Sequence, residues 1–220
     1  MNLAEEFALL AYGEDGTPET DSMHLDNGLG GSLLLELALS GRVEVADKKV
    51  LVRDHTPTGD PLVDQALARI VADEKLRKPT HWVTKFAKDA RKLTLDRLVA
   101  DEVLVREQDK VLFVFNRTKY PTPTGLETPA ETEARQRLRA AVAAPGAVEP
   151  RTGALCALVA ATDLDRKVFR DLDRKQVRAR LKEISAGDWA ATAVKKAIED
   201  IQTAVTVAIV ASTSAAAATS

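Results

Sequence analysis

The amino-acid sequence predicts a mainly α-helical protein, and two patterns carry this prediction. Apolar residues recur three to four positions apart, as on one face of a helix, through most of the chain. The apolar–polar alternation that is typical of strands is confined to two short segments. We therefore expect about eight helices and two β-hairpins in one domain over residues 1–210, followed by a disordered tail of Ala, Ser and Thr over residues 211–220.

The N-terminal part is predicted to form a short helix and then a longer apolar one. Residues 3–11 place their apolar side chains on one face. After a polar loop over residues 13–23, Asp26 or Asn27 can cap a helix that runs from Gly28 to Leu39. This helix is apolar on most of its faces, so we expect it at the centre of the fold, where its early glycines would let another backbone approach closely.

A β-hairpin and a capped helix are predicted next. Between residues 42 and 53, valines alternate with other residues on both sides of Asp47-Lys48, which predicts a hairpin with its turn there. Asp60 is a good N-cap and Pro61 suits the first position of a helix. The apolar stripe of this helix comprises Leu62, Val63, Ala66, Leu67 and Ile70.

The following helix, from Pro79 to about residue 101, carries a concentrated basic stripe. Its apolar side contains Trp82, Phe86, Ala90 and Leu93. At about 100° per residue, several basic positions gather within a sector of about 60° on another side. These are His81, Lys85, Lys88 and Lys92, with Arg91 about one turn-width away.

A second hairpin is predicted after the basic helix. Residues 103–105 would form its first strand, residues 108–109 its turn and residues 111–115 its second strand. The second strand would be apolar on both faces, with Val111, Phe113 and Phe115 on one and Leu112 and Val114 on the other. One face should cover the core, and the other would need a helix of the same chain, a second subunit or a lipid surface to cover it.

The C-terminal part is predicted to form a series of helices separated by Pro and Gly. Their expected bounds, after a linker at residues 120–125, are residues 128–144, 152–161, 163–172, 175–184 and 188–210.

The charges are segregated along the chain. Residues 75–119 carry a net charge of +6, whereas the remainder carries −8. This local excess favours an anionic partner for the basic segment, although a solvated helix surface would show the same pattern. A basic helix followed by a hairpin over residues 80–115 also has the outline of a winged helix, but no recognition helix rich in Arg, Asn and Gln is evident. We therefore expect no nucleic-acid partner.

No pattern in the sequence indicates catalysis. It contains no glycine-rich phosphate loop, and His24, His55 and His81 share no metal-ligand spacing with the carboxylates or the cysteine. The single cysteine, Cys156, lies among apolar residues and is expected to be a buried small hydrophobe. We thus expect no enzymatic activity, no cofactor and no metal.

The sequence also shows no secretory signal and no membrane span. The most apolar stretch, residues 201–211, is 11 residues long, whereas a span needs about 20. We expect a cytoplasmic protein that could attach to the cytosolic face of a membrane.

Several segments together resemble the Golgi phosphoprotein 3 family. The most specific are Leu35-Glu36-Leu37-Ala38-Leu39 with Gly41-Arg42, followed by Pro57-Thr58-Gly59-Asp60. Further matching segments are Leu3-Ala4-Glu5-Glu6, Gly28-Leu29-Gly30-Gly31, Leu98-Val99 with Val103-Leu104, Tyr120-Pro121, and Arg151 with Ala154 and Leu155. The resemblance covers most of residues 1–160 and more loosely the rest.

The resemblance implies a single helical domain with a bundle-like core and a projecting β-hairpin, and a non-enzymatic adaptor function. Eukaryotic members of the family bind phosphatidylinositol 4-phosphate on Golgi membranes and retain glycosyltransferases through their cytosolic tails. The family's hairpin, which falls on residues 103–115 here, is implicated in oligomerisation and membrane contact. The implied partners are a phosphoinositide-like anionic headgroup, a second copy of the chain and an unidentified protein client.

The resemblance also implies where a headgroup would bind. The family uses two basic residues one helical turn apart before the second hairpin, and these fall on Lys88 and Arg91. The family's arginine near the start of the Gly-Leu helix falls on Gly30, and its tryptophan falls near residues 21–23. This chain has neither an arginine nor an aromatic residue at those places.

One main hypothesis joins these observations. Lys85, Lys88, Arg91 and Lys92 would face an anionic membrane surface, where each contributes about 1 kcal/mol. The hairpin residues 111–115 would contact lipid or a second subunit. The alternative is a cytosolic protein–protein adaptor that does not bind lipid.

Overall fold

The computed structural model describes residues 1–111, 115–186 and 192–218, excluding the side chains of residues 110–111, 115–116, 186, 192–195 and 216–218. These residues form ten helices and two antiparallel hairpins, so the mainly α-helical class is confirmed. The helices are α1 (Leu3–Ala11), α2 (Ser22–Leu39), α3 (Pro61–Val71), α4 (Pro79–Ala87), α5 (Ala90–Ala100), α6 (Pro129–Ala143), α7 (Pro150–Ala161), α8 (Asp165–Val168), α9 (Arg174–Ala186) and α10 (Thr192–Ala218). The strands are β1 (Val43–Ala46), β2 (Lys49–Val52), β3 (Glu107–Val111) and β4 (Phe115–Lys119).

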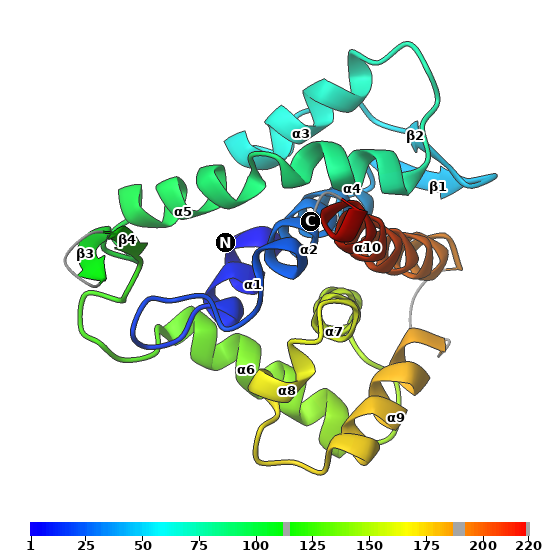
Figure 1. The fold of residues 1–220 in the computed structure, drawn as a ribbon. Coiled ribbons are helices and arrows are strands. Elements are labelled where there is room, and N and C mark those ends of the chain that lie inside the picture. The colour runs from blue at the N-terminus through cyan, green and yellow to red at the C-terminus, as the bar shows by residue number, and fades with distance from the viewer. Residues whose placement is uncertain (112–114, 187–191, 219–220) are drawn as a thin grey trace.

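Helix α2 forms the centre of the fold. It packs against α1, α4, α7 and α10, and Figure 1 shows the other helices arranged around it. Every leucine of α2 except Leu39, at its C-terminal end, is buried, as a largely apolar helix requires. The helix begins at Ser22, six residues before the predicted start, because Oδ1 of Asp21 accepts hydrogen bonds from the backbone N–H groups of Met23 and His24. Asp26 therefore lies inside the helix and does not cap it.

The expected close approach to the glycines of α2 is observed at Gly30. A Cβ atom at this position would lie 2.4 Å from the carbonyl oxygen of Val83 and 2.9 Å from the amide nitrogen of Ala87, both on or at the end of α4. Only a residue without a side chain permits this contact between α2 and α4. Gly30 is therefore a buried packing position.

The predicted helix over residues 79–101 is two helices. Lys88 and Asp89 separate α4 from α5. The backbone of Asp89, with φ −136° and ψ −9°, is not helical. Its carboxylate is held by Arg69 of α3, with Oδ1 2.9 Å from Nη1. Local sequence does not stop a helix here, so the prediction missed a break that a contact with another helix stabilises. Trp82, Phe86 and Ala90 are buried as predicted.

The first hairpin and the helix after it are confirmed. Strands β1 and β2 pair Val43 with Val52 and Ala46 with Lys49, and the turn residues Asp47 and Lys48 have φ values of +49° and +59°. Two positive φ values are typical of the tight turn that matches strand twist in a two-residue loop.

The second hairpin differs from the prediction. Strands β3 and β4 pair Glu107 with Lys119 and Val111 with Phe115, so the predicted turn residues 108–109 lie within a strand. Val111 ends one strand and Phe115 begins the other, hence residues 111–115 are not a single two-faced strand. Leu112, Phe113 and Val114 lie outside the described residues. The prediction placed the strands about four residues early because the apolar run suggested a strand interior, whereas the actual strands are largely polar.

Helices α6 to α9 form the part of the fold furthest from α3 (Figure 1). Helix α6 begins after Thr128, whose Oγ1 accepts a hydrogen bond from the amide of Glu131. The predicted helix over residues 163–172 shortens to the single turn of α8. Helix α10 continues through Ala218, eight residues beyond its predicted end, while its predicted start at residue 188 lies outside the described residues.

Two further properties bear on function. Cys156 is fully buried in α7, and burial raises its pKa to about 12, so it is a core residue as expected. None of the described helices combines the length and the apolar character that crossing a membrane requires.

Candidate functional site

The four cations of the predicted basic stripe have different surroundings. Lys85 is half-buried, with Nζ 4.7 Å from the centre of the Trp82 ring, a cation–π contact. Lys88 is exposed at the C-terminal cap of α4, and its side chain makes no hydrogen bond or ion pair within the described part of the chain. Lys88 is therefore a cation available to a partner.

Arg91 is held by the beginning of α2. Its Nε lies 2.6 Å from Oδ1 of Asp26, and its Nη2 donates to the carbonyl oxygen of Ser22 at 2.8 Å. Burial raises the pKa of Asp26, while the guanidinium opposes that rise. The structure thus brings residues 88–91 beside residues 21–23, the two segments to which the family resemblance assigned the headgroup site.

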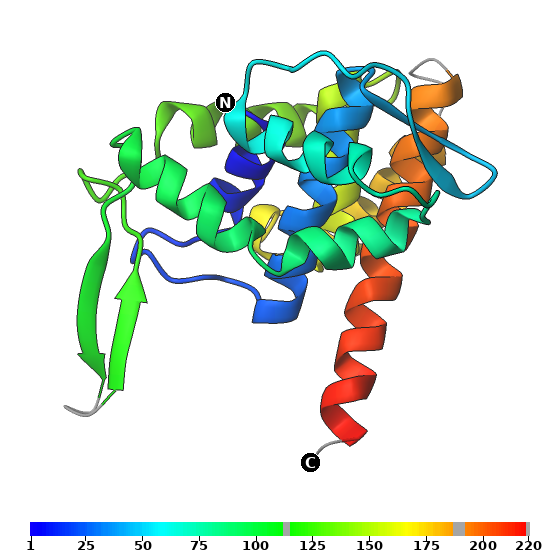
Figure 2. The same cartoon turned by 90° about the horizontal axis from the view of Figure 1, so that it is seen from above.

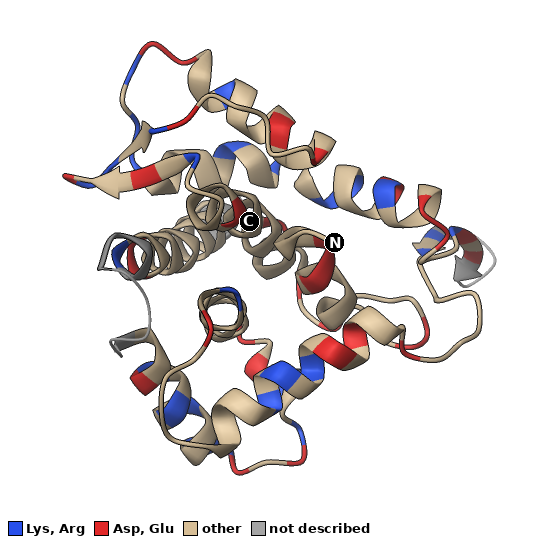
Figure 3. Cartoon of the chain, turned by 180° about the vertical axis from the view of Figure 1, so that it is seen from behind, with Lys and Arg blue, Asp and Glu red and all other residues tan. Residues whose placement is uncertain are grey.

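Lys92 is paired within its own helix. Its Nζ lies 2.5 Å from Oδ2 of Asp96, whose other oxygen accepts from Arg106. Figure 3 shows acidic residues interspersed with basic ones along α5. The break between α4 and α5 and these ion pairs mean that the four cations do not form one continuous unpaired stripe.

Positive charge also gathers around His81 on α4, where Arg77 is paired with Asp73 at 3.1 Å, whereas Lys85 and Lys88 form no ion pair within the described residues. The pKa of His81 is lowered mainly by burial and also by Arg77, Lys85 and Lys88, while Asp73 opposes the shift from 3.9 Å. Arg77 lies in the connection before α4 and was not among the predicted site residues. Helical periodicity gives no signal for Arg77, because the residue lies between α3 and α4 and belongs to neither helix.

Gly30 does not belong to this surface. It is buried beneath the backbone of α4, so the position to which the resemblance assigned the family's arginine is a packing contact in this fold.

The hairpin and the end of α10 extend from the helical body on the same side. Figure 2 shows both projections, with the first turns of α2 on that side between them. The expected projection of the β3–β4 hairpin is thus observed. Arg91, which contacts Ser22, lies beside those first turns.

A comparison with protein-family models gives a match that spans nearly the whole chain. The model described as Golgi phosphoprotein 3 (GPP34) matches residues 3–201.

Proposed function

The chain belongs to the Golgi phosphoprotein 3 family, and on this premise we propose that it is a non-enzymatic adaptor that docks reversibly on an anionic membrane surface. The observation that carries the proposal is the exposed, unpaired ammonium of Lys88. Lys88 precedes Arg91 by three residues, and Arg91 contacts the start of α2. The anionic partner would be a phosphoinositide-like headgroup. Lys85 would add a second cation from the same helix.

The ion pairs of the structure reduce the electrostatic attraction below the value expected for four free cations. Asp26 and Asp96 neutralise Arg91 and Lys92, which leaves Lys85 and Lys88 as the main contributors. At about 1 kcal/mol for each cation, they supply about 2 kcal/mol, or about a 30-fold gain in affinity. Such attachment would be weak and sensitive to salt.

The β3–β4 hairpin would supply the remaining attraction. The chain from Val111 to Phe115 consists of five consecutive apolar residues, and the pairing of Val111 with Phe115 makes this the connection between the strands. Burying one large apolar side chain contributes about 1.5–3 kcal/mol. Burial of two such side chains against lipid, or against the same segment of a second copy, would therefore contribute more free energy than the two lysines.

Co-sedimentation with vesicles tests this proposal. Binding should require anionic lipid and weaken at high salt, and Lys88→Glu should reduce it more than Lys175→Glu, which makes the same charge change at an exposed position of α9. Equal binding by both variants would contradict the assigned surface.

The pairing of Arg91 and Lys92 favours a second candidate function. An adaptor that contacts only proteins has no need of free cations at these positions, and both are neutralised here. Absence of binding to every vesicle composition would favour this alternative.

A further inference from the structure

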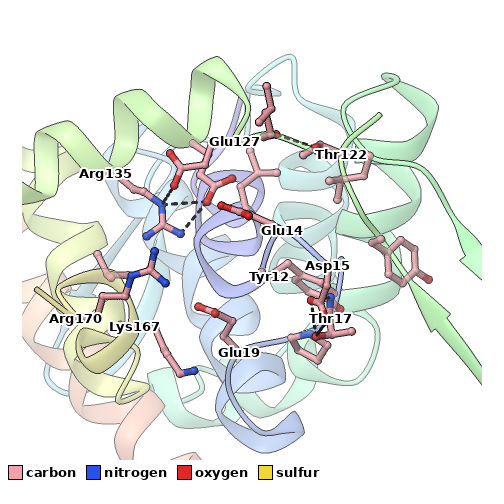
Figure 4. Close-up of a pocket in the computed structure, with 18 of the residues that line it drawn as sticks. Tyr12, Glu14, Asp15, Thr17, Glu19, Thr122, Glu127, Arg135, Lys167 and Arg170 are labelled. Atoms are coloured by element: carbon pink, nitrogen blue, oxygen red, sulfur yellow. Dashed lines mark hydrogen bonds and ion pairs between the residues drawn. The ribbon is translucent and has the colours of Figure 1, made fainter. Parts of the chain in front are cut away.

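A cavity of about 500 Å³ lies where the end of α1, the α1–α2 connection, residues 120–127, α6 and α8 meet. Its inner wall is apolar and buried, and is formed by Leu9, Tyr12, Leu104 and Val168. Charged side chains of both signs surround this wall, as Figure 4 shows. The volume is within the range of small-molecule sites, about 300–1,000 Å³.

The wall formed by the α1–α2 connection is fixed by contacts with the root of the hairpin. The carbonyl oxygen of Gly16 accepts a hydrogen bond from the amide of Tyr120 at 2.8 Å. Gly16 has a φ of +72°, and a Cβ atom there would lie 2.3 Å from the nitrogen of Pro121. The carboxylate of Asp15 accepts hydrogen bonds from the backbone amide and the hydroxyl group of Thr17. The cavity is therefore formed before any ligand arrives.

One end of the cavity has an excess of carboxylates. Arg135 is shared by Glu127 at 3.0 Å and Glu131 at 2.8 Å. Burial raises the pKa of Glu131, and the nearby Glu127 and Glu19 raise it further. The Glu131 side chain is 8% exposed, and both hydrogen bonds from Arg135 go to its Oε1, which leaves Oε2 without a hydrogen bond in the described structure. This end thus holds the carboxylates of Glu19, Glu127 and Glu131 but a single guanidinium, which binds two of them.

The other end has an excess of cations. Lys167 and Arg170 line the cavity from α8 and the turn after it, and in the described residues neither side chain forms an ion pair. Arg139 also lines this end, but Asp171 binds it through two hydrogen bonds of 2.7 and 2.8 Å. In Figure 4 Lys167 and Arg170 lie on the side of the cavity opposite Glu14 and Asp15.

The spacing along α6 sets the separation of the two ends. Glu131, Arg135 and Arg139 lie four residues apart on one face, so the span from the first to the last is about 12 Å at 1.5 Å per residue. The side chains at both ends extend into the cavity, so the distance between the charged groups that a ligand would contact is shorter than this backbone span.

We propose that this cavity binds a ligand that carries a cation and a carboxylate at opposite ends of a short flexible chain, as free arginine and lysine do. The guanidinium or ammonium group would lie among Glu19 and Glu131, and the carboxylate would be bound by Lys167 and Arg170. The same pair of groups occurs at the C-terminus of a peptide that ends in arginine. This inference does not depend on membrane binding.

Isothermal titration calorimetry on the full chain tests the proposal with four probes. L-arginine and the tripeptide Gly-Gly-Arg distinguish a free amino acid from a peptide end. Agmatine, which is arginine without its carboxylate, and the amidated tripeptide remove the anionic end. We expect saturable binding of arginine, of the tripeptide or of both, and at least ten-fold weaker binding of the corresponding probe that lacks the carboxylate.

Variants locate the binding site. Glu19→Gln and Arg170→Gln should each weaken binding at least ten-fold. Glu133→Gln on the exposed side of α6 and Arg166→Gln beside the cavity make the same charge changes and should have little effect. The proposal is overturned if neither arginine nor the tripeptide binds at about 10 mM, where a ligand with a Kd of about 1 mM would be largely bound. Equal binding of agmatine, or binding unaffected by both cavity variants, would overturn it as well. Because no vesicle is present, none of these outcomes bears on the membrane proposal.

Discussion

The Nε atom of Arg91 lies 2.6 Å from Oδ1 of Asp26, which places a carboxylate of α2 where the anionic partner of that arginine would bind. The two residues are 65 positions apart, and only the packing of α5 beside the start of α2 brings them together. The Arg91–Asp26 pair therefore carries no net charge. A headgroup phosphate would have to compete with the Asp26 carboxylate for the Arg91 guanidinium.

Removal of this carboxylate should strengthen membrane binding. Asp26→Asn restores the charge of Arg91, so affinity for anionic vesicles should rise about five-fold, as expected for about 1 kcal/mol. Asp171→Asn is the matched control, because it makes the same charge change beside Arg139, outside the proposed membrane-binding surface. Co-sedimentation measures both. A gain that persists when Arg91→Gln is added to Asp26→Asn would show that Arg91 is not the cation involved.

Acidic pH should also strengthen binding, through His81. Burial and the cations Arg77, Lys85 and Lys88 lower its pKa, so the side chain is neutral at pH 7 and gains a proton only below its ordinary range. Each proton gained adds positive charge to the α4 surface. Vesicle binding should therefore increase as the pH falls below about 6.5, the ordinary value for histidine, and His81→Gln should lose part of that increase. The exposed His55→Gln serves as the control, and identical pH profiles for the two variants would exclude His81.

Substitution of Gly30 should destabilise the fold. Gly30→Ala places a Cβ 2.4 Å from the carbonyl oxygen of Val83, a backbone atom that cannot move without shifting α4. Overpacking of this kind costs about 1–3 kcal/mol of unfolding free energy. Urea denaturation followed by circular dichroism measures the loss. Gly13→Ala meets only ordinary contacts of 3.4 Å or more, so its effect should be small, and equal effects would contradict the close approach of the helices.

The ion pairs of Arg151 should contribute more to stability than those of Arg139. Arg151 binds Glu6 at 2.9 Å, Glu36 at 3.1 Å and the carbonyl oxygen of Met1 at 2.9 Å, and thereby joins α7 to α1 and α2. Arg151→Ala leaves two largely buried carboxylates without this partner and should cost about 3 kcal/mol. The pair of Arg139 with Asp171 is exposed and screened by solvent, so Arg139→Ala should cost much less. Comparable losses in urea denaturation of Arg151→Ala and Arg139→Ala would contradict this assignment.

The sequence determined the elements that depend on neighbouring residues. Asp60 caps α3 and Pro61 begins it, as predicted, because a cap acts on amides two and three residues away. The turn at Asp47-Lys48 follows equally from its own backbone preferences. The family assignment also came from the sequence and is confirmed by the match over residues 3–201.

The tertiary structure alone decided that Arg91 is paired with an internal carboxylate. The same local pattern fits one straight helix or two, and the contact of Arg69 with Asp89 accompanies the break between α4 and α5. Asp96 lies four residues after Lys92 on the same helix, a spacing at which the sequence itself indicates an ion pair. Asp26 could not be assigned as the counter-ion of Arg91, because periodicity gives the face of a helix on which a side chain lies but not what lies opposite. Charge along a chain is a property of composition, whereas free charge on a surface depends on distances between residues that only packing brings together.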